Sequence, residues 1–294
     1  MVKIDNLKTE NRNAKTENLD SLSISEILSV MNSEDQNVLA TIKDAIPFIT
    51  NLIEQTVKAY QNGGRIIYIG AGTSGRLGLM DAVEVVPTFN SDRFVGLIAG
   101  GDNAFVKAVE GAEDSKELCV EDLKKINFNS KDFLIGIAAS GRTPYVIGGI
   151  EYAKSLGAKS GCVVCNKGSE IGKLVDYPIE VDAGSEVLTG STRLKSGTCQ
   201  KIILNMISTI TMIKVGKVYK NLMVDVKATN EKLVERCRRI VMMATDCDHD
   251  TADKALKEVD NNCKVAIVMI LFNKTKDEAI ASLKEADGFI RNVK

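Results

Sequence analysis

Three short loops carry most of the chemistry that this chain could perform. They are Gly70-Ala-Gly-Thr-Ser-Gly75, Ser140-Gly-Arg-Thr143 and Thr189-Gly-Ser-Thr192, and each stands directly after an apolar strand-like run or directly before a helix-like stretch. Glycine lets the backbone approach a ligand closely, hydroxyl and N–H groups donate to phosphate oxygens, and a helix N-terminus favours negative charge. Together the loops predict a pocket for a sugar phosphate.

The residues of these loops that could contact such a ligand are hydroxyls, glycines and basic side chains. We expect substrate binding by Thr73, Ser74, Gly75, Ser140, Gly141, Arg142, Thr143, Ser191, Thr192 and Lys195. Pro144 stands where a helix begins, so Ser140 and Thr143 would lie at its positive end. Both could instead be ordinary helix caps, and basic residues such as Arg193 and Lys195 are more often solvated surface.

The first loop also fits the glycine fingerprint of dinucleotide-binding proteins. That fingerprint needs an acidic residue near the end of the second strand, about 20 residues on, and Asp102 comes late for this role. The pair Thr73-Ser74 and the second hydroxyl loop at Ser140 fit a phosphomonoester better than a pyrophosphate. We therefore favour a sugar phosphate over a nicotinamide cofactor.

The elements that must position these loops alternate between strands and helices. Nearly pure apolar runs predict strands at 66–69, 94–99, 133–139, 161–165 and 177–181, with helix-like stretches at 76–85, 104–110, 115–125 and 144–156. Apolar runs of this kind are typical of parallel strands that are covered on both faces. The alternation predicts an α/β fold, with a parallel five-stranded sheet flanked by helices in Rossmann-like layers.

Helical spacing of apolar residues predicts further helices outside this alternation. One covers 35–62 and ends at Gly63-Gly64, and a long buried one covers 198–218. After Asn230 no further strand is expected, and the apolar run at 263–272 is assigned to a helix because no partner strand is near. We expect a sugar-phosphate-binding domain at 1–230, with an N-terminal helical extension, and a small helical domain at 231–294.

The composition favours a small ligand over a macromolecule. The 38 basic and 39 acidic residues give a net charge of -1, which offers no broad basic field to nucleic acid or an anionic membrane. No run reaches about 18 apolar residues, and Met1 to Asp20 lacks a signal-peptide pattern, so we expect a cytoplasmic protein. The seven cysteines fit reduced thiols, with Cys162 and Cys165 in the core, and the single histidine leaves a zinc site without evident ligands.

Several motifs in one order resemble a known family over nearly the whole chain. They are Tyr68-Ile-Gly-Ala-Gly-Thr-Ser-Gly-Arg-Leu-Gly78, Gly96-Leu-Ile-Ala-Gly-Gly101, Val109-Glu-Gly-Ala-Glu-Asp114, Ser140-Gly-Arg-Thr-Pro144 and the motifs from Gly190 to Asp225. The chain resembles the N-acetylmuramic acid 6-phosphate etherase family, within the wider sugar isomerase domain family. The resemblance implies cleavage of the D-lactyl ether at carbon 3 of the sugar, giving N-acetylglucosamine 6-phosphate and D-lactate. It also implies a homodimer, no metal, no organic cofactor, and a C-terminal domain similar to the ubiquitin-associated fold.

The chemistry of the ring-opened sugar asks for two acid–base groups. Removal of the carbon 2 proton lets lactate leave by elimination, and water then adds to the unsaturated aldehyde, so two carboxylates with separated pKa values would suffice. The resemblance assigns these roles to Glu84 and Glu113. We expect Glu113 to be the base, and Glu84, placed just before Pro87 breaks its helix, to protonate lactate and then activate water. From spacing alone, Glu110, Glu113 and Asp114 cannot be told apart.

The chain departs from the family pattern next to the first glutamate. Val85-Val86-Pro87 stands where relatives usually carry a cysteine followed by prolines, and Asn90-Ser-Asp-Arg93 is shorter than expected.

Two other functions remain open. A phosphosugar aldose–ketose isomerase needs the base but no acid at carbon 3. A sugar-phosphate-responsive regulator binds without turnover, and a DNA-binding version would need a basic helix-turn-helix that the N-terminal segment lacks.

Overall fold

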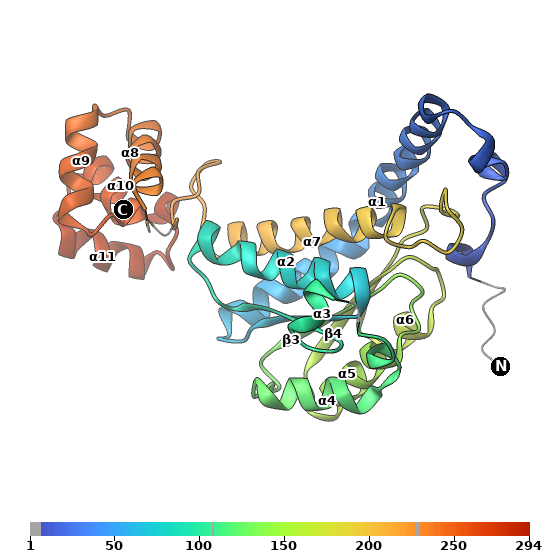
Figure 1. Ribbon diagram of the computed structural model, residues 1–294. Helices are drawn as coiled ribbons and strands as arrows, with labels where there is room; N and C mark the ends of the chain where they lie inside the picture. Colours follow the sequence, from blue (N-terminus) through green and yellow to red (C-terminus); the bar gives the residue numbers. More distant parts are fainter. Residues whose placement is uncertain (1–6, 108, 227, 229) are drawn as a thin grey trace. The chain divides into compact units, whose positions relative to one another are not determined.

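The computed structural model describes residues 7–107, 109–226, 228 and 230–294 of the chain. It divides into two compact units. One combines the residues up to Ala82 with Arg93–Ser208, and the other combines Val83–Asp92 with Thr209–Lys294. The first unit holds the sheet (Figure 1). The domain boundary that we place after residue 230 stays a prediction.

A parallel sheet of five strands, counted among the described residues, is the centre of the first unit. Its strands are β1 (Ile66–Gly70), β2 (Phe94–Ile98), β3 (Phe133–Ala138), β4 (Lys159–Val164) and β5 (Tyr177–Glu180), in the spatial order β2-β1-β3-β4-β5. Ile67 of β1 pairs with Val95 of β2 and with Leu134 of β3. The predicted sheet is confirmed. Because the strand order reverses at β1, the carboxyl ends of β1 and β3 form the switch point where such sheets bind ligands.

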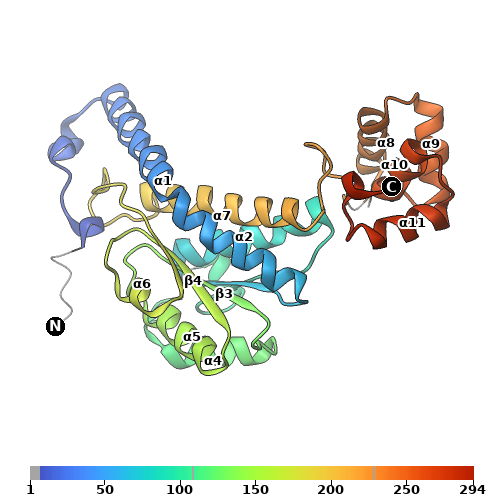
Figure 2. The same ribbon diagram turned by 180° about the vertical axis from the view of Figure 1, so that it is seen from behind.

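Helices cover both faces of this sheet (Figures 1 and 2). On one face lie α1 (Ile24–Gln61), α2 (Gly72–Phe89) and α7 (Lys195–Lys214), and on the other α4 (Lys116–Lys125) and α5 (Pro144–Ser155). The connections contain the short α3 (Asn103–Val106) and α6 (Glu170–Leu174). Cys162 and Cys165 are buried, as predicted. Strands covered on both faces explain why their sequences are almost entirely apolar.

Two helices extend beyond the ranges that the sequence predicts. α1 begins at Ile24 because Ser23 and Glu26 form a capping box. α2 begins inside the first loop and continues through Pro87 to Phe89, so the prediction that Pro87 ends it is wrong. A proline removes only its own N–H bond, and Asn90, with φ of 48°, ends the helix three residues later.

The predicted helix over 104–110 is shorter than expected. It forms only as α3, and a 3₁₀ turn at Ala112–Asp114 follows before α4. Residue 108 lies outside the described residues. Three further 3₁₀ turns, at Lys8–Glu10, Ala14–Thr16 and Leu19–Ser21, precede α1.

The second unit contains a bundle of helices from residue 231 on. They are α8 (Glu231–Thr245), α9 (His249–Glu258), α10 (Cys263–Phe272) and α11 (Lys276–Glu285), with a last 3₁₀ turn at Ile290–Asn292. The apolar run at 263–272 is a helix, as predicted, and its buried residues form the centre of this core. Among the described residues, no helix combines the length and the apolar character that crossing a membrane requires.

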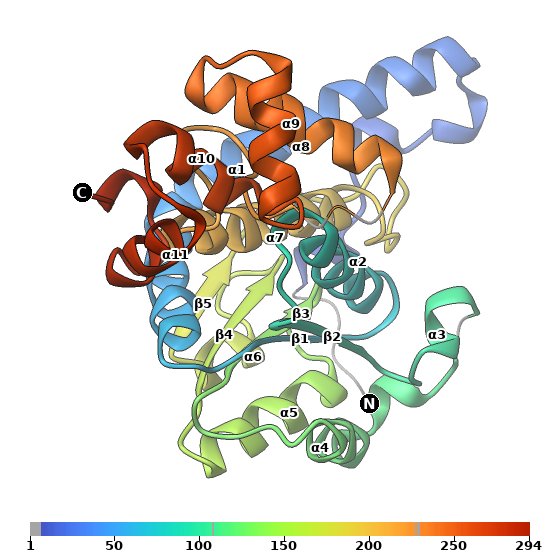
Figure 3. The same ribbon diagram turned by 90° about the vertical axis from the view of Figure 1, so that its left-hand side faces the viewer.

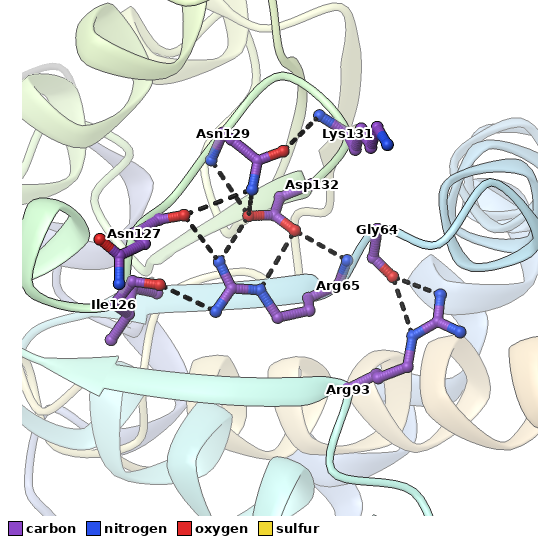
Figure 4. Close-up of polar contacts among 8 residues, drawn as sticks. All are labelled: Gly64, Arg65, Arg93, Ile126, Asn127, Asn129, Lys131 and Asp132. Carbon is purple, nitrogen blue, oxygen red and sulfur yellow. Dashed lines mark hydrogen bonds and ion pairs between the residues drawn. The ribbon is translucent and has the colours of Figure 1, made fainter.

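A polar cluster joins the strands at the amino edge of the sheet (Figure 4). The backbone N–H and Nη2 of Arg65, just before β1, donate to Asp132, just before β3, at 2.9 and 2.7 Å. Asp132 is only 3% exposed. Gly64 is needed beside this pair, because a Cβ there would stand 1.8 Å from the carbonyl oxygen of Lys131. Arg93 donates to the carbonyl of Gly64 as well, so this edge is held by bonds within the protein.

Candidate active site

A cavity of about 200 Å³ lies at the carboxyl ends of β1 and β2. Its lining comes from the first loop, the end of β2 and the turn before α4: Ala71, Gly72, Arg76, Ala99, Ala104, Val109, Glu110, Gly111 and Glu113. Glu113 belongs to the 3₁₀ turn at Ala112–Asp114. The fold therefore brings Glu113 beside the N-terminus of α2. Glu110 lines the same cavity, whereas Asp114 does not.

The first loop is held in place by close backbone approach and by Arg76. A Cβ at Gly75 would stand 2.6 Å from the carbonyl oxygen of Gly70, so glycine lets β1 turn directly into α2. Arg76 donates from Nη2 and Nε to the carbonyl oxygens of Ala104 and Phe105, at 2.7 and 2.9 Å. These bonds tie α2 to the opposite wall of the cavity.

Ser74, a predicted ligand, faces the protein interior. It is 7% exposed, and its hydroxyl donates to Oε1 of Gln200 in α7 at 2.9 Å. Thr73 is half-buried and Gly75 is buried. The contacts of these residues with a substrate stay predictions, but Ser74 also links the loop to α7.

The second loop, Ser140–Thr143, joins β3 to α5 and lines a neighbouring cavity of about 410 Å³. Ser140 and Arg142 share this cavity with Lys8 and Asp182. Pro144 is the first residue of α5, as predicted. Thr143 is the N-cap, but its side chain accepts no capping bond, so capping does not occupy its hydroxyl.

The third loop precedes a helix whose N-terminus is already occupied by a carboxylate. Glu186, fully buried, accepts from the backbone N–H groups of Lys195 and Ser196, and from the Ser196 hydroxyl, all at 2.9 Å. Ser191 and Thr192, in the loop between Glu186 and Lys195, are half-buried. This helix start is therefore stabilised internally.

The ammonium of Lys195 belongs to a buried ion pair. Lys195 is 1% exposed, and its Nζ donates to Oε2 of Glu34 in α1 at 2.8 Å. Lys15 and Asn13 donate to the same carboxylate at 2.9 and 2.8 Å. Burial raises the pKa of Glu34, but the bonds from Lys195, Lys15 and Asn13 outweigh it and bring the pKa to about 2. Lys195 thus fixes the third loop against α1 and the N-terminal segment.

Glu84 lies further along α2 than the first loop. It follows Gly72 by twelve residues, which is about 18 Å of helix. It is exposed, and it does not line the cavity of Glu113. Met80, Val83 and Val86 are exposed on the same stretch of helix, at 39%, 59% and 38%.

Comparison with known proteins identifies the family of this chain. The family described as glucokinase regulatory protein N-terminal SIS domain matches residues 48–154. The N-acetylmuramic acid 6-phosphate etherase of Bacillus cytotoxicus is 55% identical over 290 residues, which cover 98% of this chain and 99% of that protein. N-acetylmuramic acid 6-phosphate etherase 2 of Enterococcus faecalis is 56% identical and covers 98% of each chain. The chain belongs to the N-acetylmuramic acid 6-phosphate etherase family.

Solved structures share the fold of the unit that contains the sheet. A phosphoheptose isomerase from Francisella tularensis has a TM-score of 0.51 at 20% identity, covering 65% of this chain and 99% of that one. The phosphoheptose isomerase GmhA from Neisseria gonorrhoeae has a TM-score of 0.50 at 14% identity, covering 64% and 98%. Both the predicted etherase family and the predicted sugar isomerase fold are confirmed.

Three residues that hold these loops in place could not be predicted from the sequence. Glu186 and Gln200 stand near predicted ligands but carry no local signal, because an acidic or amide residue beside a helix start is common. Glu34 contacts Lys195 across 161 positions, a separation that no motif reveals. Gln200 and Glu34 contact side chains that we did predict, Ser74 and Lys195, whereas Glu186 binds backbone N–H groups and Ser196.

Proposed function

We propose that this protein cleaves the D-lactyl ether of N-acetylmuramate 6-phosphate, giving N-acetylglucosamine 6-phosphate and D-lactate. The observation that carries the proposal is Glu113 in a cavity beside the N-terminus of α2, in a chain of the etherase family. The seven cysteines, all among the described residues and all free, support the cytoplasm as its location.

The phosphate of the substrate is bound by the first two loops. The helices α2 and α5 begin on either side of the β1–β3 switch point, where backbone N–H groups and the positive helix ends favour an anion. Glu186 already occupies the start of α7, and a second anion beside its carboxylate would be repelled. Thr73, Ser74, Gly75 and the residues 140–143 are therefore the proposed phosphate ligands. Ser191 and Thr192 are left for other parts of the sugar.

Glu113 acts as the base on the ring-opened sugar. Its carboxylate takes the carbon 2 proton, the electron pair forms the double bond between carbons 2 and 3, and the bond from carbon 3 to the ether oxygen breaks. Glu84 gives its proton to the departing lactate. The carboxylate of Glu84 then takes a proton from water, whose oxygen adds to carbon 3, and the proton on Glu113 returns to carbon 2.

Glu84 comes from the partner in a homodimer. Carbon 3 is only a few bonds from the phosphate, whereas about 18 Å of helix separates Glu84 from the start of its own α2. A phosphate at that helix start therefore leaves the Glu84 of the same chain out of reach. The exposed apolar residues Met80, Val83 and Val86 around Glu84 offer a surface that a second copy would cover.

An assay of the purified protein with N-acetylmuramate 6-phosphate tests this function. We expect equal amounts of D-lactate and N-acetylglucosamine 6-phosphate, with one solvent oxygen in the sugar product. A ketose phosphate formed from a hexose phosphate, without lactate, would instead support the isomerase. Binding of the sugar phosphate without any product would support the regulator.

A further inference from the structure

Two buried polar pairs join α2 to α7. The hydroxyl of Ser74 donates to Gln200 at 2.9 Å, and the hydroxyl of Ser208 donates to Oδ1 of Asp81 at 3.0 Å. All four residues are buried. The pairs are seven residues apart on α2 (74 to 81) and eight apart on α7 (200 to 208), about two turns of each helix. The helices therefore run parallel along one polar seam, and Figures 1 and 3 show them side by side.

The seam is more polar than stability requires. Among the described residues, Nε2 of Gln200 is buried and has no hydrogen-bond partner. Tyr68 lies in the middle of β1, and the charge of Asp81 adds to the rise in its pKa that burial causes. Buried polar groups without partners lower stability, and an apolar contact between the helices would avoid this cost.

Asp81 is the charged member of the seam. Burial raises the pKa of its carboxyl to about 6, while the Ser208 hydroxyl, Tyr68 and the ammonium of Lys201 act in the opposite direction. Burying such a group is unfavourable, yet it provides a directional contact that apolar side chains cannot. In coiled coils, a single buried polar residue can fix the register of the packed helices.

We propose that Asp81 is a positioning residue for Glu84, held in register by its bond to Ser208. Asp81 precedes Glu84 by three residues, so the two lie on neighbouring positions of the helix surface. Any sliding or rotation of α2 at Asp81 moves the Glu84 carboxyl by a similar amount. The inference rests on the acid role proposed for Glu84.

The two pairs serve different parts of α2, the first near its start and the second near its middle. Ser74 and Gln200 hold the loop that binds substrate, whereas Asp81 and Ser208 hold the stretch that carries the acid. Loss of the bond between Asp81 and Ser208 should therefore lower kcat, whereas loss of the bond between Ser74 and Gln200 should raise KM. A purely structural role would change both constants together.

Kinetics of Asp81→Leu and Gln200→Leu test the proposal. We expect Asp81→Leu to lower kcat for lactate release about tenfold, because a small displacement of a catalytic group is costly, while KM and carbon 2 proton exchange stay within about twofold. Gln200→Leu should instead raise KM with kcat largely kept. Asp81→Asn keeps an oxygen for Ser208 and should retain most of the activity. In the Glu84→Gln background, Asp81→Leu should add no further loss.

The outcomes separate this proposal from the function on which it rests. Wild-type lactate release by Asp81→Leu, with a slow Glu84→Gln, would overturn the positioning role alone. A proportional loss of exchange and release in both leucine variants would also overturn it. Wild-type release by Glu84→Gln would overturn the acid assignment and the positioning role together. If Asp81→Leu does not fold, Ser208→Ala removes the same bond and must show the same separation of release from exchange.

Discussion

The two edges of the sheet use their polar groups in different ways. At the amino edge, Arg65 and Asp132 join the starts of β1 and β3, and the buried carboxylate is satisfied by protein donors. At the carboxyl edge, the same two strands lead into α2 and α5, whose first turns lie beside open cavities. Strands of five or six residues thus separate a stabilising edge from the edge where we propose that substrate binds, called the binding edge below.

The carboxyl edge itself contains both kinds of arrangement. Gly72 at the start of α2 and Ser140 just before α5 line cavities, whereas the start of α7 is filled by the carboxylate of Glu186. The starts of these three helices look alike in sequence. A glycine and hydroxyl loop therefore marks a helix start that favours an anion, and the tertiary fold decides whether that anion is a ligand or a side chain.

The largest effect should follow a change at the binding edge. We expect Glu113→Gln to slow the exchange of the carbon 2 proton with solvent deuterium by about 1,000-fold or more, because the base is lost. Mass spectrometry of the recovered substrate measures this exchange. Glu110→Gln is the matched control, since Glu110 lines the same cavity, and it should retain exchange. The assignment fails if the two variants behave the other way round.

A change at the stabilising edge should affect folding instead of chemistry. Asp132→Ala leaves the guanidinium of Arg65 without its carboxylate, so we expect the free energy of unfolding to fall by about 3 kcal/mol. The kcat of the folded fraction should be unchanged. Denaturant unfolding measures the loss, and Glu151→Ala, in an exposed pair with Lys116, should cost less than about 1 kcal/mol. An equal cost for the two variants would contradict a special role of this edge.

Single hydroxyls at the binding edge should have intermediate effects. We expect Ser140→Ala and Thr143→Ala each to weaken substrate binding about tenfold, because each removes a donor to a charged phosphate. Ser191→Ala, next to the occupied start of α7, should weaken it less. Calorimetry in the inactive Glu113→Gln background measures the affinities. A larger loss for Ser191→Ala would move the phosphate to the third loop.

A further prediction concerns pH and the ion pair that holds the third loop. Glu34 has a pKa of about 2 in the folded protein against an ordinary 4.5, so its bonds stabilise the fold above pH 4.5 and are lost as the pH falls toward 2. We expect Glu34→Gln to be less stable than the wild type at pH 7. The difference should shrink between pH 4.5 and 2. A constant difference across that range, measured by unfolding at each pH, would show that the ionised form contributes nothing.

Much of the scaffold could be predicted from the sequence because it depends on local patterns. A covered parallel strand must be apolar throughout, so all five strands lie close to where those runs predict them. The end of α2 was missed because a proline near a helix end removes one bond without stopping the chain, and Asn90 sets the true end. The start of α1 was missed because its first turns are polar, and only the box formed by Ser23 and Glu26 marks them.

The loops of the candidate site could be picked out from the sequence, whereas the side chains that support these loops could not. Glu113 could be told from Asp114 only through the resemblance, and the cavity now includes Glu113 and excludes Asp114. The sequence predicts Lys195 as a ligand, and it does not reveal the ion pair with Glu34 because the partner lies far away in α1. Contacts between distant segments decide which side chains are left to bind a substrate. These contacts depend on how the folded chain packs, and the spacing of residues in the sequence does not reveal them.

Activity of a mixed dimer tests the division of the site between two copies. Glu84→Gln and Glu113→Gln, co-expressed with different tags and purified as the mixed dimer, leave one site with both glutamates intact. Each variant alone should release lactate at least about 100-fold more slowly than the wild type, and the mixed dimer should regain roughly half of the wild-type rate. A mixed dimer as slow as its parents would contradict a site in which Glu113 and the Glu84 of the partner act on one substrate.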